Sequence, residues 1–243
     1  MFGNLSLQLF IFGIDRMKLF DLERQSLREL NAELQKQSTR MTHQKWKILN
    51  PNGSHAIAVG INSQIEVNIE GSAGYYCGGM NQKAKINIEG SVGPGVAENM
   101  MSGQIVVDSD ASQYAGATGN GGLLVIKGNA SSRCGISMKG INIVVHGDIG
   151  HMSAFMGQSG NLVVCGNAGD GLGDSLYEAR IFVKGSVKSL GTDCVQKEMR
   201  EKDLKDLRIL LQKSFSECNP EDFKRYGSSR KLYNFNVDRS NEY

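Results

Sequence analysis

Acidic residues that recur at a fixed spacing are the first candidates for chemistry in this chain. Glu70, Glu89 and Asp108 follow one another at intervals of 19 residues, and two neighbouring carboxylates are what acid–base cleavage of a glycosidic bond requires. Lys127 occupies the next position of the series, and no series of aromatic residues accompanies it to hold a sugar ring. We interpret these acids as a solvated edge and assign no catalytic residue.

His146 and Cys165 continue the same series and are the one histidine–cysteine adjacency that the spacing produces. Two ligands are too few for a structural zinc site, which takes four, so we expect no metal in this chain. The glycine-rich run 116–122 lacks a GxGxxG or Gly-Lys-Ser/Thr pattern, and a strand follows it instead of a helix. We interpret the run as part of the repeat and expect no cofactor in it.

Glycine sets the register to which these residues belong. Apolar residues stand four and two positions before each glycine of the register, and Ser, Asp or Asn follows it directly. This pattern favours a short strand followed by a corner. The glycines recur every 19 residues, with Ser109 in the one gap: Gly71, Gly90, Gly128, Gly147, Gly166 and Gly185.

A repeat this short predicts an all-β solenoid, a right-handed parallel β-helix with coils of about 19 residues. Equivalent residues of successive coils would stack about 4.8 Å apart. The corner glycine is then explained by positive φ or by close approach of the backbones. A second column of small residues lets the return path lie close to the strand: Gly78, Ala97, Gly116, Gly135, Ala154 and Gly173.

The outward position in the middle of each strand changes character along the chain. It is polar in the first two coils, at Asn68 and Asn87, and apolar in the next five. A strand that is apolar on both faces must be buried on both. The outward face could be covered by the chain's own C-terminal helix or by another protein, and the sequence does not decide between these two alternatives. The five interface candidates are Val106, Val125, Val144, Val163 and Phe182.

The N-terminal part divides into two regions. Residues 1–16 bear no relation to the rest of the chain, and we expect an extension with a misassigned start, Met17 being the true one. Residues 17–45 contain a capping box at Ser26 and Glu29 followed by a leucine stripe. We expect a helix that covers the open end of the solenoid, with docking on a partner as the alternative.

The solenoid itself is expected over residues 46–192, and appendages over 193–243. A helix is expected at about 195–215, ended by Asn219 and Pro220, and the tail from Phe223 to Tyr243 is expected to pack on another surface. The apolar stripe of this helix consists of Leu204, Leu207, Leu211 and Phe215.

Composition narrows the classes of partner. The net charge of +2 gives no case for binding nucleic acid or a membrane surface. No apolar run reaches the roughly 18 residues that span a bilayer. Cys77 and Cys134 share a column but lie three coils apart, about 14 Å, which is too far for a disulfide. Five cysteines without a spacing pattern suit reduced thiols in the cytoplasm.

Longer stretches of the chain carry a family resemblance. They are residues 27–31, 74–77, 93–103, 115–119, 133–140, 150–156, 172–179 and 225–233. Over about residues 20–243 the chain resembles the GXGXG domain, the β-helix at the C-terminus of the glutamate synthase large subunit. It is most similar to the stand-alone β-helix subunit of N-methylglutamate synthase.

The resemblance implies a hetero-oligomer. Its partners would be an amidotransferase-like subunit and a flavin and iron–sulfur subunit of the glutamate synthase type, with FMN and the cluster in that partner. The implied reaction is methylamine plus glutamate giving N-methylglutamate and ammonia, or ammonia transfer in a variant complex. The implied role of this chain is structural. The β-helix subunit of a formylmethanofuran dehydrogenase and an autonomous β-helix hydrolase are the alternatives.

Overall fold

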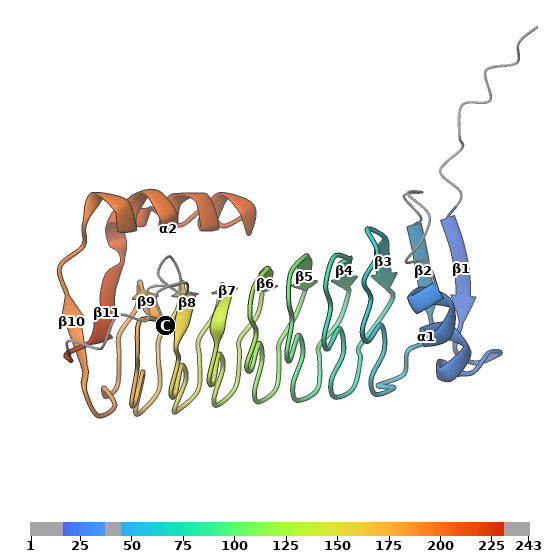
Figure 1. Cartoon of the computed structure of the whole chain (residues 1–243), viewed down its shortest axis with the longest axis horizontal. Helices are drawn as coiled ribbons and strands as arrows, with labels where there is room; N and C mark the ends of the chain where they lie inside the picture. The colour runs from blue at the N-terminus through green and yellow to red at the C-terminus, as the bar shows by residue number, and fades with distance from the viewer. Residues whose placement is uncertain (1–16, 37–44, 231–243) are drawn as a thin grey trace, which may run out of the picture.

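The computed structural model describes residues 17–36 and 45–230. The expected extension 1–16, and the part of the expected tail beyond residue 230, lie outside these residues. The described chain is mostly β, a parallel β-solenoid of about 7 turns with about 19 residues per turn, which confirms the predicted fold class (Figure 1). No described helix is long and apolar enough to cross a membrane.

The regular coils each contribute one short strand in parallel register with its neighbours. Val67 pairs with Ile86, and Ile86 pairs with Ile105, so the inward column predicted from the repeat is a continuous ladder. The strands are β3 (Glu66–Ile69), β4 (Lys85–Ile88), β5 (Gln104–Val107), β6 (Leu123–Ile126), β7 (Lys139–Val145), β8 (Ser159–Val164) and β9 (Arg180–Val183).

The N-terminal end adds a strand that the sequence pattern did not predict. Strand β1 (Met17–Asp21) lies parallel to β2 (Lys45–Leu49), with Met17 opposite Lys45. Helix α1 (Leu27–Lys36) connects them and lies at that end of the solenoid (Figure 1).

The capping box at the start of α1 is confirmed. The Ser26 amide donates to the Glu29 carboxylate at 2.9 Å, and the Glu29 amide donates to the Ser26 hydroxyl at 3.3 Å. Leu30 and Leu34 are fully buried in the main core, as their stripe predicted.

The C-terminal end folds back onto the solenoid. Strand β10 (Cys194–Lys197), helix α2 (Glu201–Lys213), a 3-10 turn (Pro220–Asp222) and strand β11 (Lys224–Ser228) follow one another. Strand β11 lies antiparallel between β9 and β10 and ends the parallel ladder.

The helix expected at 195–215 is therefore corrected at both ends. Its first residues form β10, and Phe215 lies beyond the helix in a left-handed conformation with 77% of its surface exposed.

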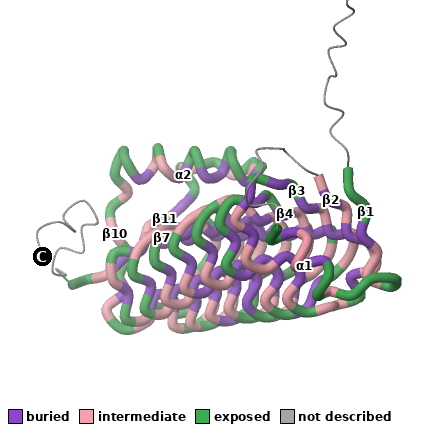
Figure 2. The backbone as a smooth tube through the Cα atoms, turned by 45° about the vertical axis from the view of Figure 1, so that its right-hand side comes forward, coloured by how far each residue is buried: buried purple, intermediate pink, exposed green. Residues whose placement is uncertain are grey.

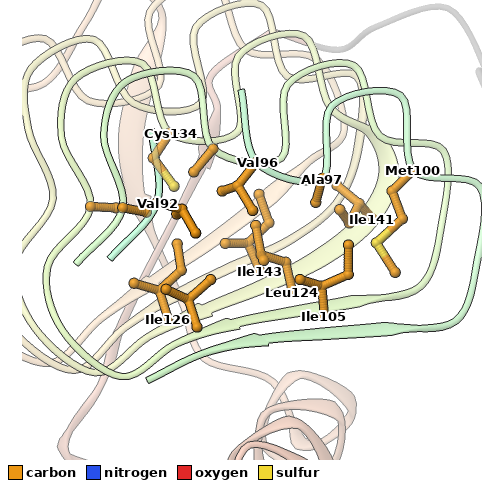
Figure 3. Packing of buried hydrophobic residues seen from close by; sticks show 14 of the residues in the cluster. Val92, Val96, Ala97, Met100, Ile105, Leu124, Ile126, Cys134, Ile141 and Ile143 are labelled. Carbon is orange, nitrogen blue, oxygen red and sulfur yellow. The ribbon is translucent and has the colours of Figure 1, made fainter. Parts of the chain in front are cut away.

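The core is a narrow apolar stack inside the coils. Ile105, Leu124 and Ile143 come from successive strands, and Val96 and Cys134 face them from the return path (Figure 3). Apolar side chains from the strands and from the return path fill the interior of the coils and leave little free volume. Each coil is therefore stabilised by packing against the coils before and after it.

Corner glycines are explained by close backbone approach. A Cβ on Gly147 would lie 2.8 Å from the carbonyl oxygen of Gly128, and Gly90, Gly128, Gly166 and Gly185 meet the preceding coil equally closely. Positive φ, the other predicted cause, occurs in this column at Gly71. The polar residue after the glycine completes the corner, because the Asp148 amide donates to the Asn129 side chain at 2.8 Å.

The return segment of each coil runs from the corner back to the next strand and has an unusual backbone. Three residues at alternate positions are left-handed, as at Tyr114, Gly116 and Thr118. The Tyr114 amide donates forward to Ser132 at 3.1 Å, and the Gly116 amide donates back to Val96 at 2.8 Å. Hydrogen bonds in both directions thus hold a conformation that costs non-glycine residues about 1 kcal/mol or more.

Candidate functional site

The apolar outward column is covered by the chain's own helix. Val125, Val144, Val163 and Phe182 are fully buried, and Val106 at the end of the column is half-buried. Leu207, Leu210 and Leu211 of α2, together with Phe223, form one apolar cluster with them. Figures 1 and 2 show α2 lying over these strands, with its inner side buried and its outer side exposed.

These four side chains are therefore not accessible to another protein, which corrects their prediction as interface candidates. The sequence leaves two alternatives for what covers the column, and in the structure it is the chain's own helix. Leu204 is half-buried and Leu210 replaces Phe215 in the apolar stripe of that helix.

A buried carboxylate fixes α2 in this position. Asp203 has no exposed surface and accepts hydrogen bonds from Arg180 of β9 at 2.9 Å and from Arg200 at 2.8 Å. Arg225 of β11 lies 3.5 Å away. Burial would raise the pKa of Asp203, but the hydrogen bonds from Arg200 and Arg180 outweigh it and hold the pKa well below its usual range.

The acids that recur along the strand edge have structural partners. Glu70 forms an ion pair with Lys47, Asp108 pairs with Lys127 at 2.7 Å, and Glu89 accepts a hydrogen bond from Asn68 at 2.6 Å. Over residues 17–36 and 45–230, no group of three or more His, Cys, Asp or Glu side chains could hold a metal ion.

Cys165 has a neighbour that the repeat could not reveal. Its thiol lies 3.5 Å from the Ser216 hydroxyl and also contacts Cys218, which comes after α2. Burial raises the pKa of the Cys165 thiol to about 12. The imidazole Nε2 of His146 is buried and has no hydrogen-bond partner among the described residues, and burial lowers the pKa of His146. All five cysteines are free thiols.

Six of the eight stretches that carry the family resemblance coincide with the return segments. Residues 74–77, 93–103, 115–119, 133–140, 150–156 and 172–179 contain the alternating left-handed positions. Their specificity as a motif thus has a structural cause, since few sequences hold three left-handed residues in each coil.

Return segments also expose large apolar side chains. Tyr75, Met80, Met101 and Met156 are between 41% and 51% exposed. Methionine adapts to irregular surfaces, and tyrosine is enriched where proteins meet. We call the side of the solenoid formed by the return segments the return face. It is one apolar surface that the described chain leaves exposed; others are Met17 and Leu19 of β1 and Phe215 after α2.

A groove in the return face brings aromatic rings together. It has a volume of about 410 Å³. The rings of His55 and Tyr75 lie 4.1 Å apart at its edge, and the Arg133 guanidinium lies 6.0 Å from the Tyr114 ring. Its lining includes His55, Tyr75, Tyr76, Pro94, Glu98 and Tyr114.

Sequence reasoning missed this groove, although one signal was present. Tyr76 and Tyr114 are 38 residues apart, which is two periods of 19, so they share a column with Gly95 between them. No aromatic series accompanies the acids on the strand edge, whereas these tyrosines lie on the return segments. Burial raises the pKa of Glu98 in this groove.

One known protein is closely related to the chain. Protein GlxC of Rhizobium meliloti (strain 1021) is 61% identical over 228 residues, which span 93% of this chain and 100% of that protein. No family model matches the chain.

Proposed function

The chain belongs to the same family as Protein GlxC, and on this basis we propose that it is a non-catalytic structural subunit of a glutamate-synthase-like complex. The relationship is consistent with a glutamate-synthase-like β-helix subunit. In the finer form of the proposal the complex is an N-methylglutamate synthase. It transfers methylamine to the glutamate skeleton and releases ammonia.

The return face is the observation that carries the proposal. Six of the eight stretches that resemble the GXGXG domain lie there, and so do the exposed Tyr75, Met80, Met101 and Met156. A subunit that positions other proteins needs an open apolar surface on a rigid frame. The solenoid supplies that frame, because its backbone hydrogen bonds run from coil to coil.

The proposed partners divide the chemistry between them. An amidotransferase-like subunit handles the amine or amide, and a flavin and iron–sulfur subunit holds FMN and the cluster. This chain binds both on the return face and keeps their active sites in register. It contributes no catalytic residue in this proposal.

Reconstitution tests the proposal. The chain is purified together with the proteins encoded beside its gene, and formation of N-methylglutamate and of glutamate is measured with and without it. We expect activity to require the chain, and methylamine to be the preferred amine. Full activity of the partners alone would contradict the structural role, while ammonia preference would contradict the finer form.

Surface variants locate the contact. Met101→Asp places a charge on the return face and should weaken assembly, whereas Gln212→Asp, on the exposed side of α2, should not. Equal retention of partners by both variants would place the interface elsewhere.

A further inference from the structure

The groove on the return face has the composition of a cation site. Tyr76, Tyr114 and the stacked pair of His55 and Tyr75 supply aromatic rings, and Glu98 supplies a carboxylate. The faces of aromatic rings attract cations through their negative quadrupole. We propose that this groove binds an organic ammonium group.

The position of the Glu98 carboxylate is the first argument. Gly95 stands between Tyr76 and Tyr114 in the column, and a Cβ on Gly95 would lie 2.7 Å from the Glu98 Oε2. The carboxylate therefore occupies the space that a side chain at residue 95 would fill. It lies between two tyrosines whose backbones are two coils apart, about 9.6 Å.

The lining offers several rings to an ammonium group. Tyr75, Tyr76 and Tyr114 all line the groove, and a cation and a ring attract each other when they lie within roughly 6 Å. The Tyr114 ring already accepts a contact of this kind, since the Arg133 guanidinium lies 6.0 Å from its centroid.

Charge is the second argument. Glu98 is half-buried, and its carboxylate makes no hydrogen bond or ion pair with another residue of the described chain. Glu70, Asp108 and Asp203, by contrast, each have a cationic partner. A desolvated carboxylate without a counter-ion excludes anions from the groove and favours a cation there.

The ammonium group has two sources with the same chemistry: a free alkylammonium ion, or a lysine side chain of another protein. A neutral ligand such as a sugar would stack on the rings but would gain nothing from the carboxylate. The preference for cation over neutral isostere is therefore the property to measure.

Titration of the full chain tests the proposal. Amide chemical shifts of Gly93 and Gly95 are followed by NMR while n-propylammonium chloride is added up to about 50 mM, with 1-propanol and sodium chloride as controls. We expect saturable shifts with the ammonium ion and none that saturate with the controls. Equal binding of 1-propanol, or no saturable shift with the ammonium ion, would overturn the proposal.

Variants assign the effect to the groove. Glu98→Gln removes the charge at nearly constant volume, and Tyr114→Leu removes a ring; each should weaken binding roughly tenfold. Glu178→Gln, an exposed acid in the last return segment, is the matched control and should bind as the unmodified chain does. Unaltered binding by Glu98→Gln, with an unaltered thermal melt, would also overturn the proposal.

Binding measurements on the assembled complex distinguish the two sources of the ammonium group. Retained binding of n-propylammonium there indicates a free ion, whereas a blocked groove together with weaker assembly of Glu98→Gln indicates a lysine of a partner. Binding by the isolated chain does not depend on the proposed function, so failure of one leaves the other standing.

Discussion

Arg180 and Asp203 join the solenoid to the helix that covers it. The Arg180 Nη1 donates to the Asp203 Oδ1 at 2.9 Å, and the Asp203 side chain has no exposed surface. Arg180 also donates to Asp206 at 2.8 Å, one turn further along α2. One guanidinium thus fixes the rotation of the helix, and the leucines of α2 face the apolar column as a result.

Replacing Asp203 with Asn should destabilise the chain by about 3 kcal/mol, because it removes a fully buried carboxylate and leaves Arg180 and Arg225, whose side chains are 20% and 15% exposed, without its charge. Asp206→Asn is the matched control. It removes a partly exposed partner of the same arginine and should cost less than about 1 kcal/mol. Chemical denaturation measures both, and equal losses would show that Asp203 does not hold the helix.

The contribution of Asp203 should depend on pH with a defined sign. Its pKa is lower in the folded chain than in the unfolded chain, where it is about 3.9. The stabilisation is therefore complete above that value and is lost as the pH falls toward the folded pKa. The stability difference between the unmodified chain and Asp203→Asn should be constant from about pH 5 to 8 and shrink below about pH 4.

Val144→Asp should destabilise the isolated subunit by roughly 3 kcal/mol or more, since Val144 is fully buried under α2 and an aspartate there has no partner. Asn87→Asp introduces the same side chain in the same column, outside the cover, and should cost less than about 1 kcal/mol. Thermal melts of the two variants compare them. Equal melting temperatures would mean that the helix leaves the column in solution.

Gly147→Val should cost roughly 3 kcal/mol, because a Cβ would lie 2.3 Å from the Asn129 Oδ1 and 2.8 Å from the Gly128 carbonyl oxygen. Gly227→Ala in β11 provides the contrast: its Cβ would meet nothing closer than Lys197 Cγ at 3.6 Å. Urea denaturation of both variants is the measurement. A tolerated valine at residue 147 would contradict close approach as the cause of the glycine repeat.

Cysteine reactivity should follow burial. Burial raises the pKa of Cys77 and Cys134 to about 12 and that of Cys194 to about 11. A thiol with a pKa of about 12 is ionised at about one part in ten thousand at pH 8. Iodoacetamide should therefore label Cys218 first in the native chain, and all five only after unfolding. Peptide mass spectrometry would contradict this if Cys77 were labelled as fast as Cys218.

The repeat predicted the fold because each column is a local pattern repeated in space. It also showed that the column from Val106 to Phe182 needs a cover. It could not identify that cover, since the position of α2 depends on Arg180 meeting Asp203 across the fold. The repeat does not predict strand β1, because Met17 pairs with Lys45, outside the 19-residue spacing. In addition, the charged Lys18 stands opposite the buried Trp46, at a position where the pattern has an apolar residue.

The groove illustrates a different limit. Tyr76 and Tyr114 share a column in the sequence, but their proximity to Glu98 depends on the left-handed turns that bend each return segment. Backbone hydrogen bonds between coils stabilise those turns. Such bonds form with many residue types, so the sequence pattern does not predict them. The sequence predicts Phe215 in the helix stripe because the chain leaves the helix at Ser214 without a proline or glycine there.

The central claim is that this chain works as a structural subunit of a larger complex. The most direct measurement is the molar mass, by light scattering after size exclusion, of the tagged chain expressed with the proposed partners, an amidotransferase-like protein and a flavin and iron–sulfur protein. We predict one species of fixed stoichiometry that contains all three proteins, and its loss with Met101→Asp but not with Gln212→Asp. Elution of the chain alone, at its own mass of 26.5 kDa, would contradict the claim.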